Sequence, residues 1–147
     1  MSTRANVIIT TKDETLIFYR HSDGYPECAG KDLAEFVQPY LTGAMRDSVM
    51  QSAGWLIILG HAEYASGQST LAPTSDKFSG WKCGAYEPTT CLHGDVEYVY
   101  IIHLDDKTLE CRVPKGKFWD DPKLANTKQL YSSTFADAVN QPGLQRA

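Results

Sequence analysis

The chain has 147 residues, of which 42% are hydrophobic and 22% are charged, and its formal net charge is -4. These values are typical of a soluble globular protein, and they predict a single domain over residues 1–147. The acidic balance argues against a broad nucleic-acid-binding surface. No apolar run is long enough for a signal peptide or a membrane span, so we expect a cytoplasmic protein with its four cysteines reduced.

Two β-strands are predicted at the start of the chain. Residues 6–11 and 15–21 are rich in β-branched and aromatic side chains, and the polar turn at 12–14 between them predicts a β-hairpin. The stretch SDGYP at residues 22–26 follows. Because Asp-Gly ahead of a proline is a strong turn signal, the second strand should end there.

Two helices are predicted next. Apolar side chains recur at helical spacing in residues 31–41, and a longer helix is predicted from about residue 46 to residue 64. Gly54 lies inside the longer helix, where glycine costs about 1 kcal/mol relative to alanine, and it predicts close packing against another element. Residues 65–80 show no periodicity and predict a long loop.

Three further strands are predicted, at residues 81–86, 96–104 and 108–113. The strand at 96–104 has apolar side chains on both faces, so it should be central and covered on both sides. A short helix is expected at 133–139, and a flexible tail from about residue 141. The order ββ-αα-βββ predicts an α+β fold, with a mostly antiparallel five-stranded sheet and two helices packed on one face.

Two histidines stand two residues before an aspartate, in His21-Ser-Asp23 and in His93-Gly-Asp95. An imidazole held by a carboxylate can act as a general base, so either pair could serve an acid–base hydrolase. An aspartate at such a position can equally cap its own turn. We expect the turn role for both aspartates and keep the acid–base role as the alternative.

No motif for a metal, a cofactor or a catalytic nucleophile is recognisable. Cys83, Cys91 and His93 lie near one another in sequence, but their spacing does not match the close cysteine pairs of a structural zinc site. Glycine-rich phosphate loops and the nucleophile elbow of hydrolases are absent from the sequence. We therefore expect no metal and no cofactor, and we favour a binding protein over an enzyme.

Large aromatic side chains close to basic residues form a further candidate site. Rings such as Tyr25, Trp81 and Tyr86 could stack on a nucleotide while Arg4 and Arg20 pair with its phosphate. Tryptophan, tyrosine and arginine also dominate the binding energy of protein interfaces. The sequence leaves open whether these residues bind a small nucleotide or a protein, and whether Trp81 and Tyr86 are buried instead.

Two segments carry a family resemblance. STRANVI at residues 2–8 and YRHSDGYP at 19–26 resemble a family of small proteins encoded by phages and prophages, with the pattern S-T-R-[SA]-x-I and then Y-x-H-x-D-G-Y-P. The stretch WKCGAYEP at 81–88 recurs in the members most like this chain. Ser22 departs from the tryptophan that is usual there. The positions that match are Arg4, His21, Asp23, Gly24 and Tyr25.

The resemblance implies an accessory protein of a phage or mobile element that acts in the host cytoplasm. Such proteins often bind a host component, and the expected role is an anti-CRISPR-like counter-defence inhibitor that works by protein–protein interaction, as a monomer or a homodimer. We expect an ion pair between Arg4 and Asp23 across the hairpin. Small-ligand binding is the alternative, with a hydrolase less favoured. The expected binding residues are Arg4, Arg20, His21, Asp23, Tyr25, Trp81, Tyr86, His93 and Asp95.

Overall fold

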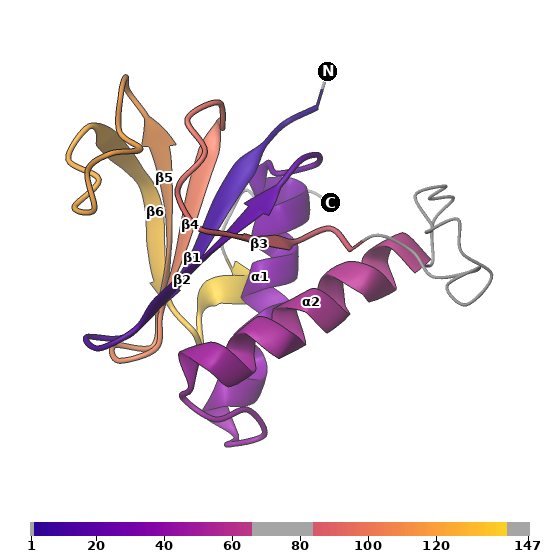
Figure 1. Ribbon diagram of the computed structural model, residues 1–147. Coiled ribbons are helices and arrows are strands. Elements are labelled where there is room, and N and C mark those ends of the chain that lie inside the picture. The colour runs from indigo at the N-terminus through magenta and orange to yellow at the C-terminus, as the bar shows by residue number, and fades with distance from the viewer. Residues whose placement is uncertain (1, 66–83, 141–147) are drawn as a thin grey trace.

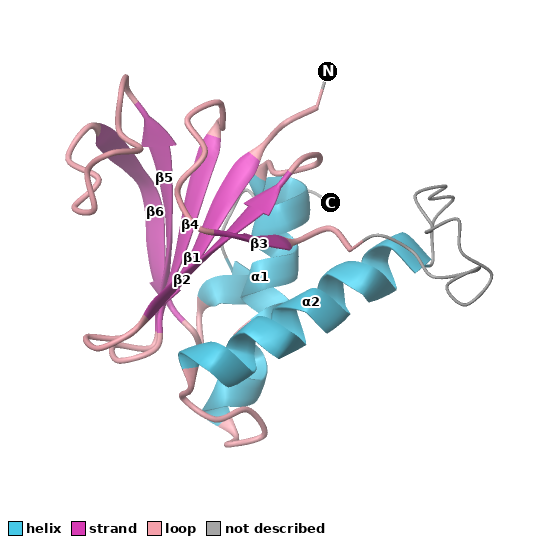
Figure 2. Cartoon of the chain, in the orientation of Figure 1, coloured by secondary structure: helices cyan, strands magenta, loops and turns pink. Residues whose placement is uncertain are grey.

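The computed structural model describes residues 2–65 and 84–140, which form an α+β fold around one mixed sheet (Figures 1 and 2). The α+β class predicted from the sequence is confirmed. The strands are β1 (Ala5–Thr10), β2 (Thr15–Arg20), β3 (Glu87–Thr89), β4 (Tyr98–His103), β5 (Thr108–Pro114) and β6 (Thr127–Thr134). The helices are the π-helix η1 (Pro26–Gly30), α1 (Lys31–Phe36), the 3-10 helix η2 (Gln38–Leu41), α2 (Val49–Ala65) and the 3-10 helix η4 (Ala138–Asn140).

The sheet has the strand order β3-β2-β1-β4-β5-β6. β1 and β4 are parallel, and the chain between them contains β2, the helices and β3. The other neighbouring strands described are antiparallel. The predicted five-stranded sheet is therefore corrected to a six-stranded, mixed one.

The additional strand is β6, and the helix predicted at 133–139 is wrong. Residues 127–134 pair with β5, with one irregularity beside Cys111 and Arg112, and a 3-10 helix forms only afterwards. Most side chains of β6 are at least partly exposed, so the segment lacks the apolar alternation by which a strand is recognised in sequence. Hydrogen bonds to β5 decide its conformation instead.

The strand predicted at 81–86 is displaced. Residues 81–83 lie outside the described part of the chain, residues 84–86 are irregular, and the short strand β3 begins at Glu87 and pairs with the edge of β2. The predicted loop lies outside the described residues apart from Ala65, which ends α2, and so does the predicted tail from residue 141.

The first predicted helix is divided, whereas the second is confirmed. α1 ends at Phe36 because Pro39 offers no N–H donor and restricts the residue before it, so the chain tightens into η2. The second helix begins at Val49, within the predicted range. In the described ranges, no helix is both long and apolar enough to cross a membrane.

Both α-helices pack on the same face of the sheet, as predicted (Figure 1). The core on this face joins Leu33 of α1 and Leu56 of α2 to Tyr100 and Ile102 of β4. The opposite face has a smaller cluster that contains no residue of either helix; its members are Ile8, Tyr19, Val96, Val99, Ile101, Phe118 and Leu124. β4 is therefore covered on both faces, as its sequence predicts.

The close approach of α2 to its neighbours occurs at Gly60, not at Gly54. A Cβ atom added at Gly60 would lie 2.9 Å from the backbone nitrogen of Ala85, whose N–H donates to the Gly60 carbonyl. Gly54 is exposed, and an added Cβ would meet no atom within 4 Å. The packing role predicted for Gly54 is thus wrong, and Gly60, six residues later, has that role.

Candidate functional site

The stretch YRHSDGYP forms a turn that ties β2 to the first helices. Asp23 has a left-handed backbone with φ 57°, and its carbonyl accepts a hydrogen bond from the Ala29 N–H. The N–H of Gly24 donates to the Thr3 carbonyl at 2.9 Å, which fixes the turn against the start of β1. Asp23 itself is exposed, so it serves the turn through its backbone.

Arg20 is the largest fully buried side chain described in the protein. Its Nε donates to the Ser22 carbonyl at 2.7 Å, and its Nη1 lies 3.4 Å from the Asp32 carboxylate of α1. Its guanidinium also lies 5.0 Å from the centre of the Tyr86 ring. The predicted binding residue Arg20 therefore joins three segments inside the core.

The predicted aromatic site is not assembled as one exposed surface. Tyr86 is 2% exposed and lies in the core, whereas Tyr25 is 37% exposed. The neighbouring Asp23 carboxylate is the main cause that raises the Tyr25 pKa. Trp81 lies outside the described residues.

Four of the predicted site residues meet around a ring that the sequence does not single out, Tyr19. The Tyr19 hydroxyl shares a hydrogen bond of 2.9 Å with Nδ1 of His21. The Tyr19 ring stacks on His93, with ring centroids 4.0 Å apart and planes 13° apart. Arg4 and Asp95 form an ion pair at 3.7 Å in the same region. We call Arg4, Tyr19, His21, His93 and Asp95 the Tyr19 cluster.

The polar groups of the Tyr19 cluster do not form the expected pairs. Arg4 pairs with Asp95 in place of Asp23, and its backbone N–H donates to the Glu97 carboxylate at 2.6 Å. Burial is the main cause that raises the pKa of Tyr19, and the nearby Asp95 adds to it. No group of three potential metal ligands occurs among the described residues, and Cys83 lies outside them.

A groove lies on the face of the sheet away from the helices, beside the Tyr19 cluster. It has a volume of about 490 Å³, within the range of small-molecule sites. Its floor consists of Ile17, Ile8 and Ile101, which are cross-strand neighbours on β2, β1 and β4. The other residues that line this sheet groove are Thr10, Thr15, Leu92, His103, Glu110, Arg112, Pro122, Lys123 and Leu124.

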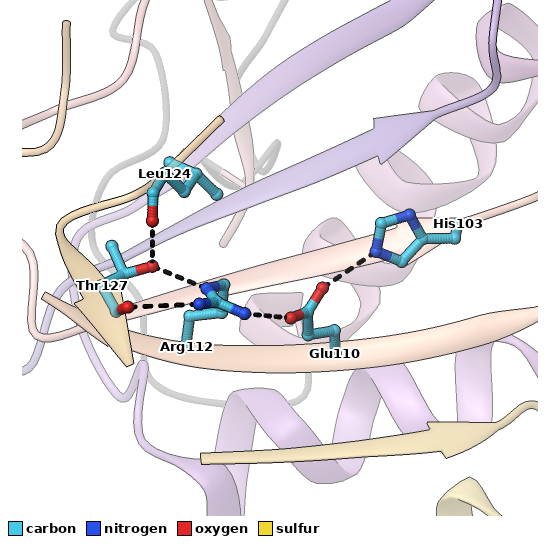
Figure 3. A network of polar contacts seen from close by, with 5 residues as sticks. All are labelled: His103, Glu110, Arg112, Leu124 and Thr127. Atoms are coloured by element: carbon cyan, nitrogen blue, oxygen red, sulfur yellow. Dashed lines mark hydrogen bonds and ion pairs between the residues drawn. The ribbon is translucent and has the colours of Figure 1, made fainter. Parts of the chain in front are cut away.

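A polar network runs along one side of the sheet groove (Figure 3). The Glu110 carboxylate contacts Nε2 of His103 at 3.0 Å through one oxygen and pairs with Arg112 through the other. Arg112 also donates to the hydroxyl and the carbonyl of Thr127. The Thr127 hydroxyl in turn donates to the carbonyl of Leu124, which has a left-handed φ of 54°. The network therefore fastens the loop at 115–126 to the edge of the groove.

A third surface is the outer side of α2. Its exposed residues include Met50, Trp55, Ile57 and Ile58, with side chains that are 41–58% exposed. Gln51, Gly54, His61 and Ala62 complete this α2 face. Among the exposed positions that the structure describes on α2, none carries a carboxylate, a lysine or an arginine. A surface helix normally turns charged or polar residues to solvent, so the α2 face is unusual.

Sequence reasoning found most of the Tyr19 cluster but missed the sheet groove and the α2 face. His103 lies on β4 and forms a hydrogen bond with Glu110. The alternation of side chains along β4 predicts that His103 and Ile101 lie on the same face of the sheet. It does not predict that Arg112 and Lys123 lie on this face too. The signal for the α2 face is present in the sequence, because apolar residues surround that helix on every side.

Comparisons of the chain with protein-family models, with curated proteins and with solved structures give no significant match.

Proposed function

We propose that the chain is a phage or mobile-element accessory protein that binds and inhibits a host protein, in the manner of anti-CRISPR inhibitors. The phage origin rests on the sequence resemblance in residues 2–8 and 19–26. The binding role is supported by one structural observation, the exposed and uncharged α2 face. Large exposed apolar patches on soluble proteins usually mark interaction sites.

The α2 face has the form expected of a protein interface. Met50, Gly54, Ile57 and Ile58 are spaced so that they lie along one side of the helix. Trp55 adds an aromatic side chain, 45% exposed, of the kind that often anchors interfaces. α2 contacts β1 and β2 with its other side, so the exposed side does not belong to the core. An apolar, uncharged patch on a host protein is the complementary partner surface.

A site-specific cross-linking experiment tests this proposal. A photoreactive phenylalanine analogue would replace Ile58 in one version of the protein and Lys128 in another. Lys128 serves as the control because it is exposed on the edge strand β6, away from the α2 face. After expression in a bacterial host, we expect one defined host protein to cross-link at position 58 and not at position 128. The purified host protein should lose activity when this chain is added.

Charge substitutions provide the matched control. Ile58→Glu should weaken binding of the cross-linked partner by about tenfold or more, because it places a carboxylate in an apolar interface. Gln129→Glu adds the same charge to an exposed polar position on β6, outside the α2 face, and should change binding less. Equal binding by Ile58→Glu would refute the α2 face as the interface. Cross-linking of two copies of this chain at position 58 would show a homodimer interface instead.

The two alternative functions receive less support from the geometry. A nucleotide site at Arg20, Tyr25 and Tyr86 is not favoured, because the side chains of Arg20 and Tyr86 are buried. For a hydrolase, His21 contacts the Tyr19 hydroxyl, whereas no hydrogen bond or ion pair of the Asp23 side chain is found among the described residues. We therefore retain protein binding as the proposed function.

A further inference from the structure

The sheet groove is independent of the α2 face, because the two lie on opposite sides of the sheet. Ile8 and Ile101 in its floor are only 8% and 7% exposed because they pack in the cluster with Phe118 and Leu124, so a ligand would contact the tips of these side chains and the more exposed Ile17. Neighbouring strands lie about 4.8 Å apart, so three adjacent isoleucines span roughly 10 Å. A floor of this width fits a flat bicyclic ring system or a short acyl chain.

The charges at the side of the sheet groove are unevenly compensated. Glu110 is already paired, because one carboxylate oxygen contacts His103 and the other contacts Arg112. Its charge is therefore not available to a cationic ligand. Lys123 also lines the groove, and no ion pair of its ammonium group is found within the described ranges. The lining residues thus carry one positive charge more than they carry negative charges, with histidine neutral.

Hydrogen-bond donors are also available at this side. A guanidinium group has five N–H donors. In its contacts with Glu110 and Thr127, each of the three guanidinium nitrogens of Arg112 donates one hydrogen bond. The remaining N–H groups can donate to a further acceptor. The Arg112 side chain is 23% exposed and is held in place by these contacts, so a bound anion would not have to order it.

We propose that the sheet groove is a binding site for a small organic anion, with a flat apolar body on the isoleucine floor and an acidic head group at Arg112 and Lys123. The apolar floor supplies affinity through the area it covers, and the cationic side chains supply the selection for negative charge. The closely fitted loop at 115–126 forms the wall that carries Lys123. This site requires no partner protein on α2.

Three ligands with the same ring system test the proposal. Naphthylacetate carries a carboxylate, naphthyl phosphate carries a phosphate, and naphthylethylamine carries an ammonium group. Binding would be measured by isothermal titration calorimetry, and the location by amide chemical-shift changes in NMR spectra. We expect at least one anion to bind about tenfold more tightly than the amine, with the largest shifts at Ile8, Ile17 and Ile101. The preferred anion distinguishes a carboxylate ligand from a phosphate ligand.

Two lysine substitutions then locate the charge selection. Lys123 and Lys128 are both exposed, but only Lys123 lines the groove. Lys123→Gln should reduce affinity for the preferred anion by about threefold, the usual effect of one exposed charge, and should strengthen rather than weaken binding of the amine. Lys128→Gln removes the same charge from the protein and should change neither. Unchanged melting temperatures would show that both variants fold.

Three results would overturn the proposal. One is the absence of binding by all three ligands at millimolar concentration, and another is equal affinity for the anions and the amine. The third is a set of shifts confined to residues outside the groove. None of these results bears on the α2 face, because the cross-linking experiment is performed without these ligands. Conversely, a failure to capture a host protein would leave the ligand measurements intact.

Discussion

The side-chain amide of Asn6 forms two hydrogen bonds with the backbone of His93. Its Nδ2 donates to the His93 carbonyl at 2.9 Å, and its Oδ1 accepts from the His93 N–H at 3.1 Å. Asn6 is fully buried on β1, whereas His93 belongs to the loop between β3 and β4. This pairing places the His93 ring on Tyr19 and thereby assembles the Tyr19 cluster.

Replacing Asn6 should therefore destabilise the protein more than replacing His93. Asn6→Ala removes two hydrogen bonds and leaves backbone groups of the loop without partners, at an expected cost of about 2–3 kcal/mol. His93→Ala removes the ring stacking and a 3.3 Å contact of Nε2 with the Thr89 hydroxyl, at about 1 kcal/mol. Urea denaturation measures both free energies of unfolding. A larger loss for His93→Ala would mean that the ring, rather than the Asn6 amide, holds the loop.

The two glycines of α2 should respond to alanine in opposite directions. Gly54→Ala should stabilise the protein by about 0.5–1 kcal/mol, because the position is helical, exposed and unobstructed. Gly60→Ala should destabilise it by about 1–3 kcal/mol, because the added Cβ meets the backbone of Ala85. Thermal melting of the two variants gives the signs directly. Destabilisation by Gly54→Ala would show that another surface approaches the helix there.

Arg20 should matter more to stability than its ion-pair partner. Arg20→Met leaves the Ser22 carbonyl without this donor and removes the contact with Tyr86, and we expect a loss of about 3 kcal/mol. Asp32→Asn should cost less, about 1–2 kcal/mol, because asparagine keeps an oxygen that can accept from the fully buried Arg20 and removes only the negative charge. Chemical denaturation compares them. Equal losses would assign the stabilisation to the ion pair itself.

Stability should depend on the backbone conformation of Asp23 and on the lack of a side chain at Gly24. Asp23→Val should destabilise the protein by about 1–2 kcal/mol, because a β-branched residue tolerates a left-handed φ poorly, while Asp23→Gly should stay within about 0.5 kcal/mol. Gly24→Ala should cost about 1–3 kcal/mol, because its Cβ would lie 2.9 Å from that of Ala5. Calorimetric melting tests all three. A large loss for Asp23→Gly would instead reveal a role for the carboxylate.

Alkaline pH should weaken the protein through Cys111. Burial raises the pKa of this thiol from 9.0 to about 12, so the unfolded state loses its proton first as the pH rises. The stabilising contribution is complete below pH 9 and is lost between pH 9 and about pH 12. From about pH 8 to about pH 10, Cys111→Ser should therefore lose about 1 kcal/mol less stability than the original protein, as measured by urea denaturation.

Several features of the fold follow from local sequence patterns. The hairpin of β1 and β2 and the two-sided burial of β4 agree with the predictions, because side chains alternate with a fixed period of two in any strand. The turn at residues 22–26 is set by the glycine, the proline and the left-handed tolerance of aspartate. These signals involve residues a few positions apart and do not depend on the rest of the chain.

The remaining features depend on residues that are far apart in sequence. The parallel pairing of β1 with β4 and the mostly exposed strand β6 arise from hydrogen bonds whose partners no local pattern specifies. Burial of Arg20 and the meeting of Arg4 with Asp95 are decided in the same way, by which segments the sheet brings together. Local patterns of residues set the strand periods, the turn and the apolar character of α2. Tertiary packing sets which apolar face is left exposed and which polar groups line the sheet groove, because both depend on what packs against each element.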